Sequence, residues 1–324
     1  MSTAIAQPNI ALIKYWGKVD EELILPATDS ISLTLDGFPT TTTVELSDDE
    51  LDTIVLNGRQ LTEAETMRMR RVLDRARELS GDRRAASITS TNTIATAAGL
   101  ASSAAGFAAL ATAVNNAYAL GLDATGISRL ARLGSGSASR SVFGGMVRWH
   151  RGHDDLTSYA ESIDWNGPEL ALVIVQLSAA QKAISSRVGM TRTIETSPFY
   201  EGWVTSNQRL VEQAMAAVAE GELAELGQLT ELSTMRMHAS MLGAVPPIRY
   251  LTGESFTVLD AVAELRNEGL TAYATADAGP NIKVLTTVAE LDDVHAWLSE
   301  RFPQAATLTS RIGAGAHLTE AAVA

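Results

Sequence analysis

Lysine is rare in this chain, and the positions that keep it are the first candidates for chemistry. It supplies four of the 25 basic residues, at Lys14, Lys18, Lys182 and Lys283, and arginine supplies the others. A position that stays lysine in such a background can require a compact, titratable ammonium, which a planar guanidinium cannot imitate. The segment KYWGK holds two of the four. It indicates a catalytic or anion-binding role for Lys14 and Lys18, with two solvated surface lysines as the alternative.

A glycine and two hydroxyl groups stand where an alanine-rich helix is expected to begin. The segment AGLASSAA places Gly99, Ser102 and Ser103 directly ahead of an alanine-rich run that extends to about residue 119. Free backbone N–H groups and the positive dipole end of a helix N-terminus favour an anion, and a missing β-carbon lets a phosphate come close. The segment predicts a phosphate site, with a Gly-Ser turn that caps a buried helix as the alternative.

A second segment of small residues, GSGSASR at 134–140, places hydroxyl groups beside a cation. Ser137 and Arg140 are three residues apart and can share one helix face, with Ser135 close by. The guanidinium of arginine matches a carboxylate or a phosphate. The alternative is a helix cap followed by a surface arginine.

A carboxylate, Asp277, follows the apolar segment TAYATA and opens the turn DAGPN. At the end of a buried strand it could be held rigidly as a general base or a metal ligand. Asp, Gly, Pro and Asn are also the residues of ordinary hairpin turns, which is the alternative interpretation.

Other candidate groups are better explained by structure than by function. His150, His153 and Asp154 have a superficial metal-ligand spacing, but a strand end that runs into an exposed turn accounts for them. His238 stands between Met235 and Met237 and is expected to pack inside the protein. The arginines of the predicted helix at 62–80 alternate with acidic residues, which favours a solvated helix face.

Composition excludes several classes of protein. The chain has 324 residues, 46% of them hydrophobic and 19% charged, with no cysteine, so disulfides and thiolate chemistry are unavailable. A formal charge of −13 argues against nucleic-acid and anionic-membrane partners, which both need clustered positive charge. The longest strongly apolar run, at 170–175, is too short for a membrane helix. We expect a soluble, cytoplasmic protein.

The pattern of the chain predicts mixed α and β structure. Strands are expected in IALIKYW, SISLTL and TTTVEL, then near 87–91, 146–150 and 170–177, and later in TAYATA and NIKVL. Helices are expected at 62–80, through the alanine-rich run to 119, in two short pieces over 124–142, and near 201–220, 222–240, 254–267 and 289–301. The second half is richer in long helices, which places a domain boundary near residue 178.

Taken together, these segments resemble one family, the mevalonate diphosphate decarboxylases. It is a branch of the superfamily of galactokinase, homoserine kinase, mevalonate kinase and phosphomevalonate kinase. The resemblance spans nearly the whole chain, and KYWGK and SGSASRS belong to the decarboxylases and not to the small-molecule kinases. The matching segments are PNIALIKYWGK (8–18), DSISLTL (29–35), TAAGLASSAAGFAAL (96–110), SRLARLGSGSASRSVFGG (128–145), SSRVGM (185–190), RMHASML (236–242) and DAGPNIKVL (277–285).

The resemblance implies a role for each segment. Asp277 matches the catalytic aspartate, Asn9 and Arg140 match the pair that holds the substrate carboxylate, and Lys18 is expected to take part in catalysis. The ATP phosphates and magnesium would lie at Gly99, Leu100, Ala101, Ser102 and Ser103, with Ser102 or Ser103 near the metal. The phosphorylated mevalonate would be lined by Lys14, Tyr15, Lys18, Ser135, Ser137, Arg140, Arg187 and Met190.

The implied reaction is ATP-dependent decarboxylation of mevalonate 5-diphosphate to isopentenyl diphosphate. Three positions depart from the family pattern: Ala95 where a proline is usual, Val19 where a basic residue is common, and Ala276 where methionine is frequent. The loss of a cation at Val19 is compatible with mevalonate 5-phosphate as an alternative substrate. A kinase that stops after phosphorylation and a non-catalytic metabolite sensor are two further alternatives. KYWGK argues against the first, and the presence of Asp277, Lys18 and Arg140 against the second.

The implied fold is α+β with two domains. Residues 1–178 would form a domain like the second domain of ribosomal protein S5, with a left-handed β-α-β crossover. Residues 179–324 would form a ferredoxin-like domain that carries Asp277. The resemblance also implies a homodimer.

Overall fold

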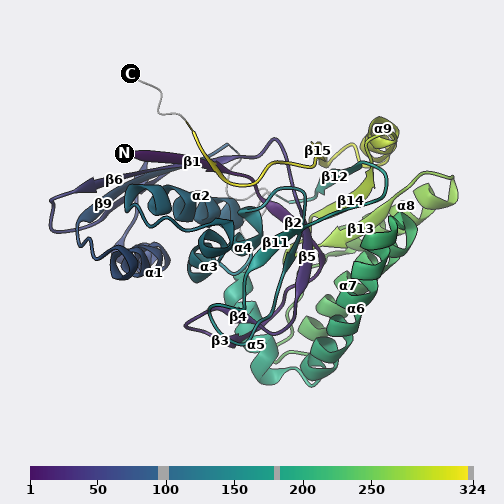
Figure 1. Ribbon diagram of the computed structural model, residues 1–324. Helices are drawn as coiled ribbons and strands as arrows, with labels where there is room; N and C mark the ends of the chain where they lie inside the picture. The colour runs from purple at the N-terminus through teal and green to yellow at the C-terminus, as the bar shows by residue number, and fades with distance from the viewer. Residues whose placement is uncertain (94–101, 179–182, 320–324) are drawn as a thin grey trace.

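The structure is a computed structural model that describes residues 1–93, 102–178 and 183–319. A six-stranded sheet in the order β16-β1-β6-β9-β7-β8 forms one end of the molecule (Figure 1). Its pairs are antiparallel except β7 with β9, which run parallel and are connected through α1. The elements of this end are β1 (Ser2–Ala6), β6 (Thr40–Ser47), β7 (Thr53–Leu56), β8 (Arg59–Gln60), β9 (Ala85–Asn92), β16 (His317–Leu318), α1 (Glu63–Ser80), α2 (Ser102–Ala117) and α3 (Ala124–Gly134).

Helix α2 lies directly on the six-stranded sheet, against β1 and β6. Ala104, Ala108 and Ala111 on this helix have no exposed surface. Their small side chains let the helix backbone approach the sheet closely, which confirms the expected close packing. The sheet and its helices thereby fix the position at which α2 begins.

A second sheet has the order β11-β10-β5-β2, with the short helix α4 beside it. The pair β3-β4 forms a separate hairpin. The elements are β2 (Asn9–Ile13), β3 (Lys18–Asp20), β4 (Leu25–Pro26), β5 (Ser30–Thr34), α4 (Ala138–Ser141), β10 (Met146–Trp149) and β11 (Ala160–Ile163).

Strand β2 ends earlier than IALIKYW predicts, at Ile13. The backbone of Lys14 turns instead to two helix side chains: its N–H donates to Ser233 Oγ at 3.0 Å, and its carbonyl accepts from Asn207 Nδ2 at 3.1 Å. These bonds replace the strand partner that Lys14 would otherwise need. The candidate site therefore begins where the strand stops.

A third, antiparallel sheet has the order β13-β14-β12-β15 and is covered on both faces. Residues of β12 point alternately toward α8 and α9 and toward α6 and α7, which explains its continuous apolar sequence. The elements are β12 (Leu170–Gln176), α5 (Ser186–Thr196), α6 (Tyr200–Glu220), α7 (Leu223–Leu242), α8 (Gly253–Asn267), β13 (Tyr273–Ala276), β14 (Ile282–Thr287), α9 (Leu291–Arg301) and β15 (Ala306–Arg311).

The second and third sheets share a core, because Ile10 and Leu12 of β2 pack in one cluster with Leu210 of α6 and Leu226 of α7. The chain then returns, and β16 pairs with β1 (Figure 1). The division near residue 178 stays a prediction. The pairing of β12 with β14 and β15 favours a division a few residues earlier, between β11 and β12.

The mixed sheets and helices confirm the α+β expectation. Thr62 and Glu65 form the predicted capping box of α1, and Gly81 ends that helix with φ 74°. Helix α5 was not expected, because only Gly189 and Thr193 of its residues are buried and it shows little apolar periodicity. In the described part of the chain, no helix combines the length and the hydropathy that a membrane span requires.

Candidate active site

A carboxylate between two buried ammonium groups lies at the centre of the site. Asp277, just after β13, reaches Lys14 Nζ at 2.9 Å through Oδ1 and Lys283 Nζ at 3.6 Å through Oδ2. The two lysine side chains are 1% and 2% exposed, whereas that of Asp277 is 28% exposed. A buried ammonium without a countercharge is costly, so each lysine favours the ionised form of Asp277. The residual exposure leaves this carboxylate accessible to a small molecule.

The turn that carries Asp277 is a hairpin between β13 and β14, which confirms the hairpin interpretation of DAGPN, while the catalytic role of Asp277 stays a prediction. The Gly279 N–H donates to the carbonyl of Asp277 at 2.7 Å. The Asn281 side chain accepts from the N–H of Ser178 and donates to its carbonyl, both at 3.0 Å. These bonds tie the turn to the end of β12 and hold Asp277 on a rigid support.

Lys14 is an unusual lysine because it is buried. Burial lowers its pKa, the Asp277 carboxylate opposes that shift, and the cations of Lys283 and Arg140 add to the lowering. Its Nζ also donates to the carbonyl of Ala11 at 2.8 Å. Lys14 is thus a point charge fixed against Asp277, as expected for a lysine that an arginine cannot replace.

Arg140 and Asn9 lie side by side, in agreement with the pairing implied by the resemblance. Arg140 Nε donates to Asn9 Oδ1 at 3.1 Å, and its Nη1 donates to Ser30 Oγ at 2.8 Å. Asn9 Nδ2 donates in turn to Ser141 Oγ at 2.7 Å and to the carbonyl of Ser137 at 3.0 Å. Burial lowers the pKa of Arg140 to about 10, with Asp277 opposing the shift, so the guanidinium is charged at neutral pH.

Tyr15 and Trp149 form the wall beside Arg140. The two rings meet edge to face at 4.8 Å, and the guanidinium of Arg140 lies 5.8 Å from the Trp149 ring centre. A β-carbon at Gly136 would stand 2.8 Å from Tyr15 Oη, so only glycine fits between Ser135 and Ser137. Burial raises the pKa of Tyr15 well above its usual range, which keeps its hydroxyl protonated and able to donate. The oxygens of the two serines lie 3.4 Å apart.

Lys18 stands apart from Asp277 in its contacts. It opens β3, its side chain is 4% exposed, and its Nζ lies 2.5 Å from Glu21 Oε2. Gly17 before it has φ +106°, and a β-carbon there would collide with Tyr200. Among the described residues, Lys14 and Lys283 are the lysines that contact Asp277. The catalytic role of Lys18 stays a prediction.

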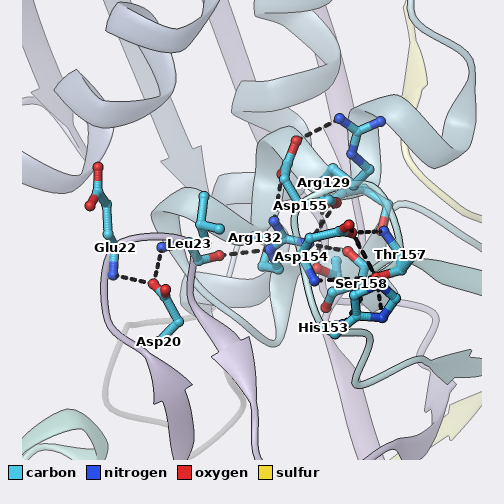
Figure 2. A network of polar contacts seen from close by, with 12 residues as sticks. Asp20, Glu22, Leu23, Arg129, Arg132, His153, Asp154, Asp155, Thr157 and Ser158 are labelled. Atoms are coloured by element: carbon cyan, nitrogen blue, oxygen red, sulfur yellow. Dashed lines mark hydrogen bonds and ion pairs between the residues drawn. The ribbon is translucent and has the colours of Figure 1, made fainter.

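A network of polar contacts anchors the hairpin that holds Lys18 (Figure 2). Arg132 is fully buried, and its Nε donates to the carbonyl of Leu23 at 2.8 Å. Its Nη2 lies 2.6 Å from Asp155, which also pairs with Arg129 at 2.6 Å, and its Nη1 donates to the carbonyl of Ser158. The Arg132 guanidinium thus connects the β3-β4 hairpin to the loop that holds Asp155 and Ser158. Helix α3, which carries Arg132, therefore fixes the position of the hairpin.

Helix α5 brings Arg187 and Met190 toward the same region. Arg187 is exposed, and Met190 packs against a small cluster that contains Trp16.

Arg68 of α1 lies over the Phe107 ring at 5.0 Å, and burial, followed by the charge of Arg187, lowers its pKa. The expectation of a uniformly solvated arginine face on α1 is therefore wrong at Arg68. Arg187 is close enough to Arg68 for its charge to contribute to this shift.

The predicted phosphate segment is only partly described. Gly99, Leu100 and Ala101 lie outside the described residues, as do Ala95 and the side chain of Ser102. Helix α2 begins at Ser102, has no acidic residue in its first turn, and exposes Ser103. A 16-residue helix with such a start can bind an anion through its free N–H groups. These features fit the phosphates of a nucleotide.

His238 belongs to the site, although the sequence indicated only packing. It is buried on α7, and burial, followed by the charge of Lys14, lowers its pKa to about 4. The backbone of Ala276 and Asp277 opposes that shift through hydrogen bonding. A neutral imidazole therefore lies beside the turn of Asp277, and its Nε2 has no hydrogen-bond partner among the described residues. His150 instead pairs with Glu161 of the neighbouring strand at 2.7 Å, and no group of three potential metal ligands occurs within the described ranges.

The geometry brings together Asn9, Lys14, Tyr15, Arg140 and Asp277, from both halves of the sequence. The sequence did not indicate that Lys283 and His238 lie beside Asp277. The rarity of lysine had marked Lys283, but nothing in its sequence neighbourhood showed which way it points.

Comparisons with known proteins agree with this geometry. Residues 6–160 match the family model of the diphosphomevalonate decarboxylase-like N-terminal domain, and residues 171–322 match that of the mevalonate 5-diphosphate decarboxylase C-terminal domain. The chain is 38% identical to the diphosphomevalonate decarboxylase of Rattus norvegicus, over 94% of this chain and 81% of the relative. It is 40% identical to that of Homo sapiens, over 89% and 78%.

Solved structures extend the likeness to the fold. A complex of MDDEF with MVAPP, AMPPCP and magnesium superposes with a TM-score of 0.93 at 43% identity, covering 98% of both chains. The mevalonate diphosphate decarboxylase of Staphylococcus aureus gives the same TM-score at 41% identity, again over 98% of both chains. Because both family models together span most of the sequence, the chain belongs to the diphosphomevalonate decarboxylase family.

Proposed function

We propose that this chain catalyses the ATP-dependent decarboxylation of mevalonate 5-diphosphate, giving isopentenyl diphosphate, ADP, phosphate and carbon dioxide. The observation that carries the proposal is Asp277, which lies against Lys14 and Lys283 and close to the pair of Arg140 and Asn9. Phosphoryl transfer to a hydroxyl also uses a proton acceptor, so the carboxylate-binding pair is the feature that points to decarboxylation. The solved complex of MDDEF with MVAPP and AMPPCP is consistent with it.

The chemistry needs both features because hydroxide is a poor leaving group. ATP supplies the phosphoryl group that turns the C3 hydroxyl into a leaving phosphate. Asp277 would orient this hydroxyl and accept its proton, since the ammonium groups of Lys14 and Lys283 favour its ionised form and the side chain is partly exposed. Departure of phosphate leaves positive charge at C3. The electron pair of the bond between C2 and the carboxyl carbon then forms the alkene, and carbon dioxide is released.

Arg140 and Asn9 would hold the substrate carboxylate until it leaves. The guanidinium is fixed from both sides, by Asn9 and by Ser30, so it offers its remaining N–H groups in one direction. A fork of this kind orients a carboxylate through parallel hydrogen bonds. Positioning and charge stabilisation of this type account for most of the catalysis expected in such a reaction.

The chain's residues fit ATP and magnesium. The start of α2 would receive the phosphates, with Ser103 exposed at that point and Ser102 adjacent to it. Magnesium is commonly held by substrate phosphates and few protein ligands, which makes one of the two serine hydroxyls sufficient on the protein side. Arg187 and Lys18 would meet the phosphates of mevalonate, with Tyr15, Ser135, Ser137 and Met190 around them.

The alternative substrate, mevalonate 5-phosphate, is favoured by one feature. Val19, where a cation is common, is 57% exposed and offers no charge. Pure protein should be assayed with ATP and each of the two phosphorylated mevalonates, with ADP and carbon dioxide measured separately. Equal amounts of ADP and carbon dioxide from the diphosphate support the proposal. ADP without carbon dioxide would identify a kinase, and turnover of the monophosphate alone would select the alternative.

We also propose that the enzyme is a homodimer. Leu232, Met235 and Leu242 form an exposed apolar stripe on one face of α7, continued by Phe199 and Val245. A second copy is a fitting cover for such a stripe. Sedimentation equilibrium should give twice the chain mass, and Met235→Glu should shift it toward the single chain. A cytoplasmic location stays a prediction from the sequence.

A further inference from the structure

Lys283 is a lysine inside a sheet. It belongs to β14, between β12 and β13, where it pairs with Ile174 and Thr275. Its neighbours Ile282 and Val284 point to the core beneath α8 and α9, so its own side chain points to the opposite face, toward α7 and β2. An ammonium at such a position needs a countercharge to be tolerated.

The countercharge is Asp277. Lys283 Nζ lies 3.6 Å from Asp277 Oδ2 and 3.4 Å from the carbonyl of Asn281, while Lys14 Nζ contacts Oδ1 at 2.9 Å. Each carboxylate oxygen thus has its own ammonium. The distance to Oδ2 is that of an ion pair and is too long for a hydrogen bond. Lys283 therefore acts on Oδ2 through its charge.

We propose that Lys283 is a positioning residue of the decarboxylation reaction, which keeps Asp277 ionised and aims Oδ2 at the substrate hydroxyl. The inference rests on the proposed function. A proton acceptor must be unprotonated at working pH, and it must present one oxygen in a defined direction. Lys14 fixes Oδ1 by a hydrogen bond, and Lys283 favours negative charge on the oxygen that would receive the proton.

In the part of the chain that the structure describes, the titratable and charged groups around Asp277 come from four places. They are Lys14 after β2, Arg140 on α4, His238 on α7 and Lys283 on β14. His238 is neutral because burial lowers its pKa to about 4. Among the described residues, three cations then face this carboxylate. Removal of Lys283 leaves less positive charge, so Asp277 should take up a proton at a higher pH than in the parent.

Lys283→Met tests this proposal through the pH dependence of kcat. We expect kcat at pH 7 to fall at least about tenfold, with KM within about threefold. The acid limb of kcat should move to higher pH by about half a unit or more, while Lys283→Arg, which keeps the charge, leaves that limb in place. The matched control is Thr275→Val. Thr275 pairs with Lys283 on the same face of the sheet, and its substitution changes no charge, so the acid limb of the kcat profile should not move. An unmoved acid limb in Lys283→Met would overturn the proposal, whatever the change in kcat.

A second readout does not depend on activity, so it separates this proposal from the proposed function. If the parent releases no carbon dioxide from either phosphorylated mevalonate, the proposed function fails, and thermal unfolding still tests the pairing. In the parent, Lys283→Met removes the ion pair with Asp277 and should lower Tm. In the Asp277→Asn background the same substitution relieves repulsion among cations, so Tm should fall less or rise. Equal changes in the two backgrounds would overturn the pairing. A methionine variant that folds in neither background would show that Lys283 is needed for folding alone, which also overturns the proposal.

Discussion

The two ends of the candidate active site are built differently. At the carboxylate end, Asn9, Lys14, Arg140 and Lys283 are at most 3% exposed and are fixed by strands and by a short helix. At the phosphate end, Ser103 and Arg187 are exposed. The groups that we propose to meet the reacting carbon and its hydroxyl are thus held in place by the fold, and preorganised charge of this kind costs no reorganisation during reaction. The groups that we propose for the phosphates are more exposed, except Lys18, whose side chain is 4% exposed and pairs with Glu21.

The first test of this contrast is Asp277→Asn, which should have the largest effect. The amide is nearly isosteric but can neither accept the proton nor carry the charge, so turnover should fall by roughly 10² to 10⁴-fold. Affinity for nucleotide and for substrate should stay within a few fold, because the phosphate end is untouched. Rapid-quench measurement of ADP formation and equilibrium binding check the two parts. A variant that keeps more than about a tenth of the parent rate would remove Asp277 from this role.

The second test concerns His238, the buried imidazole beside Asp277. Burial lowers the pKa of His238 from about 6.5 to about 4, so the unfolded chain binds a proton that the folded chain rejects between these values. The contribution of neutral His238 to the free energy of unfolding is therefore fully present above pH 6.5 and is lost as the pH falls toward 4. The loss is of the order of 3 kcal/mol, at about 1.36 kcal/mol per pKa unit.

Urea unfolding of the parent and of His238→Gln between pH 4 and 7.5 checks this expectation. The parent should lose more stability than the variant as the pH falls, since the glutamine does not titrate. Parallel curves for the two proteins would show that His238 is not the group that carries this pH dependence.

Local features of the fold could be predicted from the sequence, whereas the assembly of the carboxylate end could not. The capping box of Thr62 and Glu65 lies within four residues and gave the start of α1 correctly. The early end of β2 depends on Ser233 and Asn207, which are 219 and 193 residues away from Lys14. No periodicity in IALIKYW shows such partners.

The same limit applies to the candidate site itself. The segments KYWGK and DAGPN each indicated chemistry, but the contact of Lys14 with Asp277 joins residues 263 positions apart. The rarity of lysine had marked Lys14, Lys18 and Lys283 alike, while the contacts of the described residues make Lys14 and Lys283 the partners of the aspartate. Residue type therefore identified the groups, and only the packing of sheets decided which of them meet.

The third test addresses the phosphate end. Ser102→Ala and Ser103→Ala should differ, because adjacent positions at a helix start cannot both point at the transferred phosphate. One variant should lose turnover by roughly two orders of magnitude if its hydroxyl donates to developing charge, and the other should be close to the parent. Steady-state kinetics with varied ATP distinguishes them. Equal and mild effects would show that backbone N–H groups alone hold the nucleotide.

The last and smallest effect is expected for Lys18→Arg. Lys18 pairs with Glu21 three residues later, and a guanidinium could hold that carboxylate through two bonds and so be drawn away from the substrate phosphates. The planar group is also larger and cannot give up a proton. We expect turnover to fall at least about tenfold, or about 1.4 kcal/mol of transition-state stabilisation.

The matched control for Lys18→Arg is Arg75→Lys, which exchanges the same two residue types. Arg75 forms an ion pair with Glu78 at the same spacing, but on the exposed face of α1, where such a pair contributes little. Its turnover should equal that of the parent. If Lys18→Arg is as active as this control, charge alone suffices at the phosphate end. The need for a compact ammonium would then be confined to the buried lysines around Asp277, and the contrast between the two ends would be sharper than the sequence suggested.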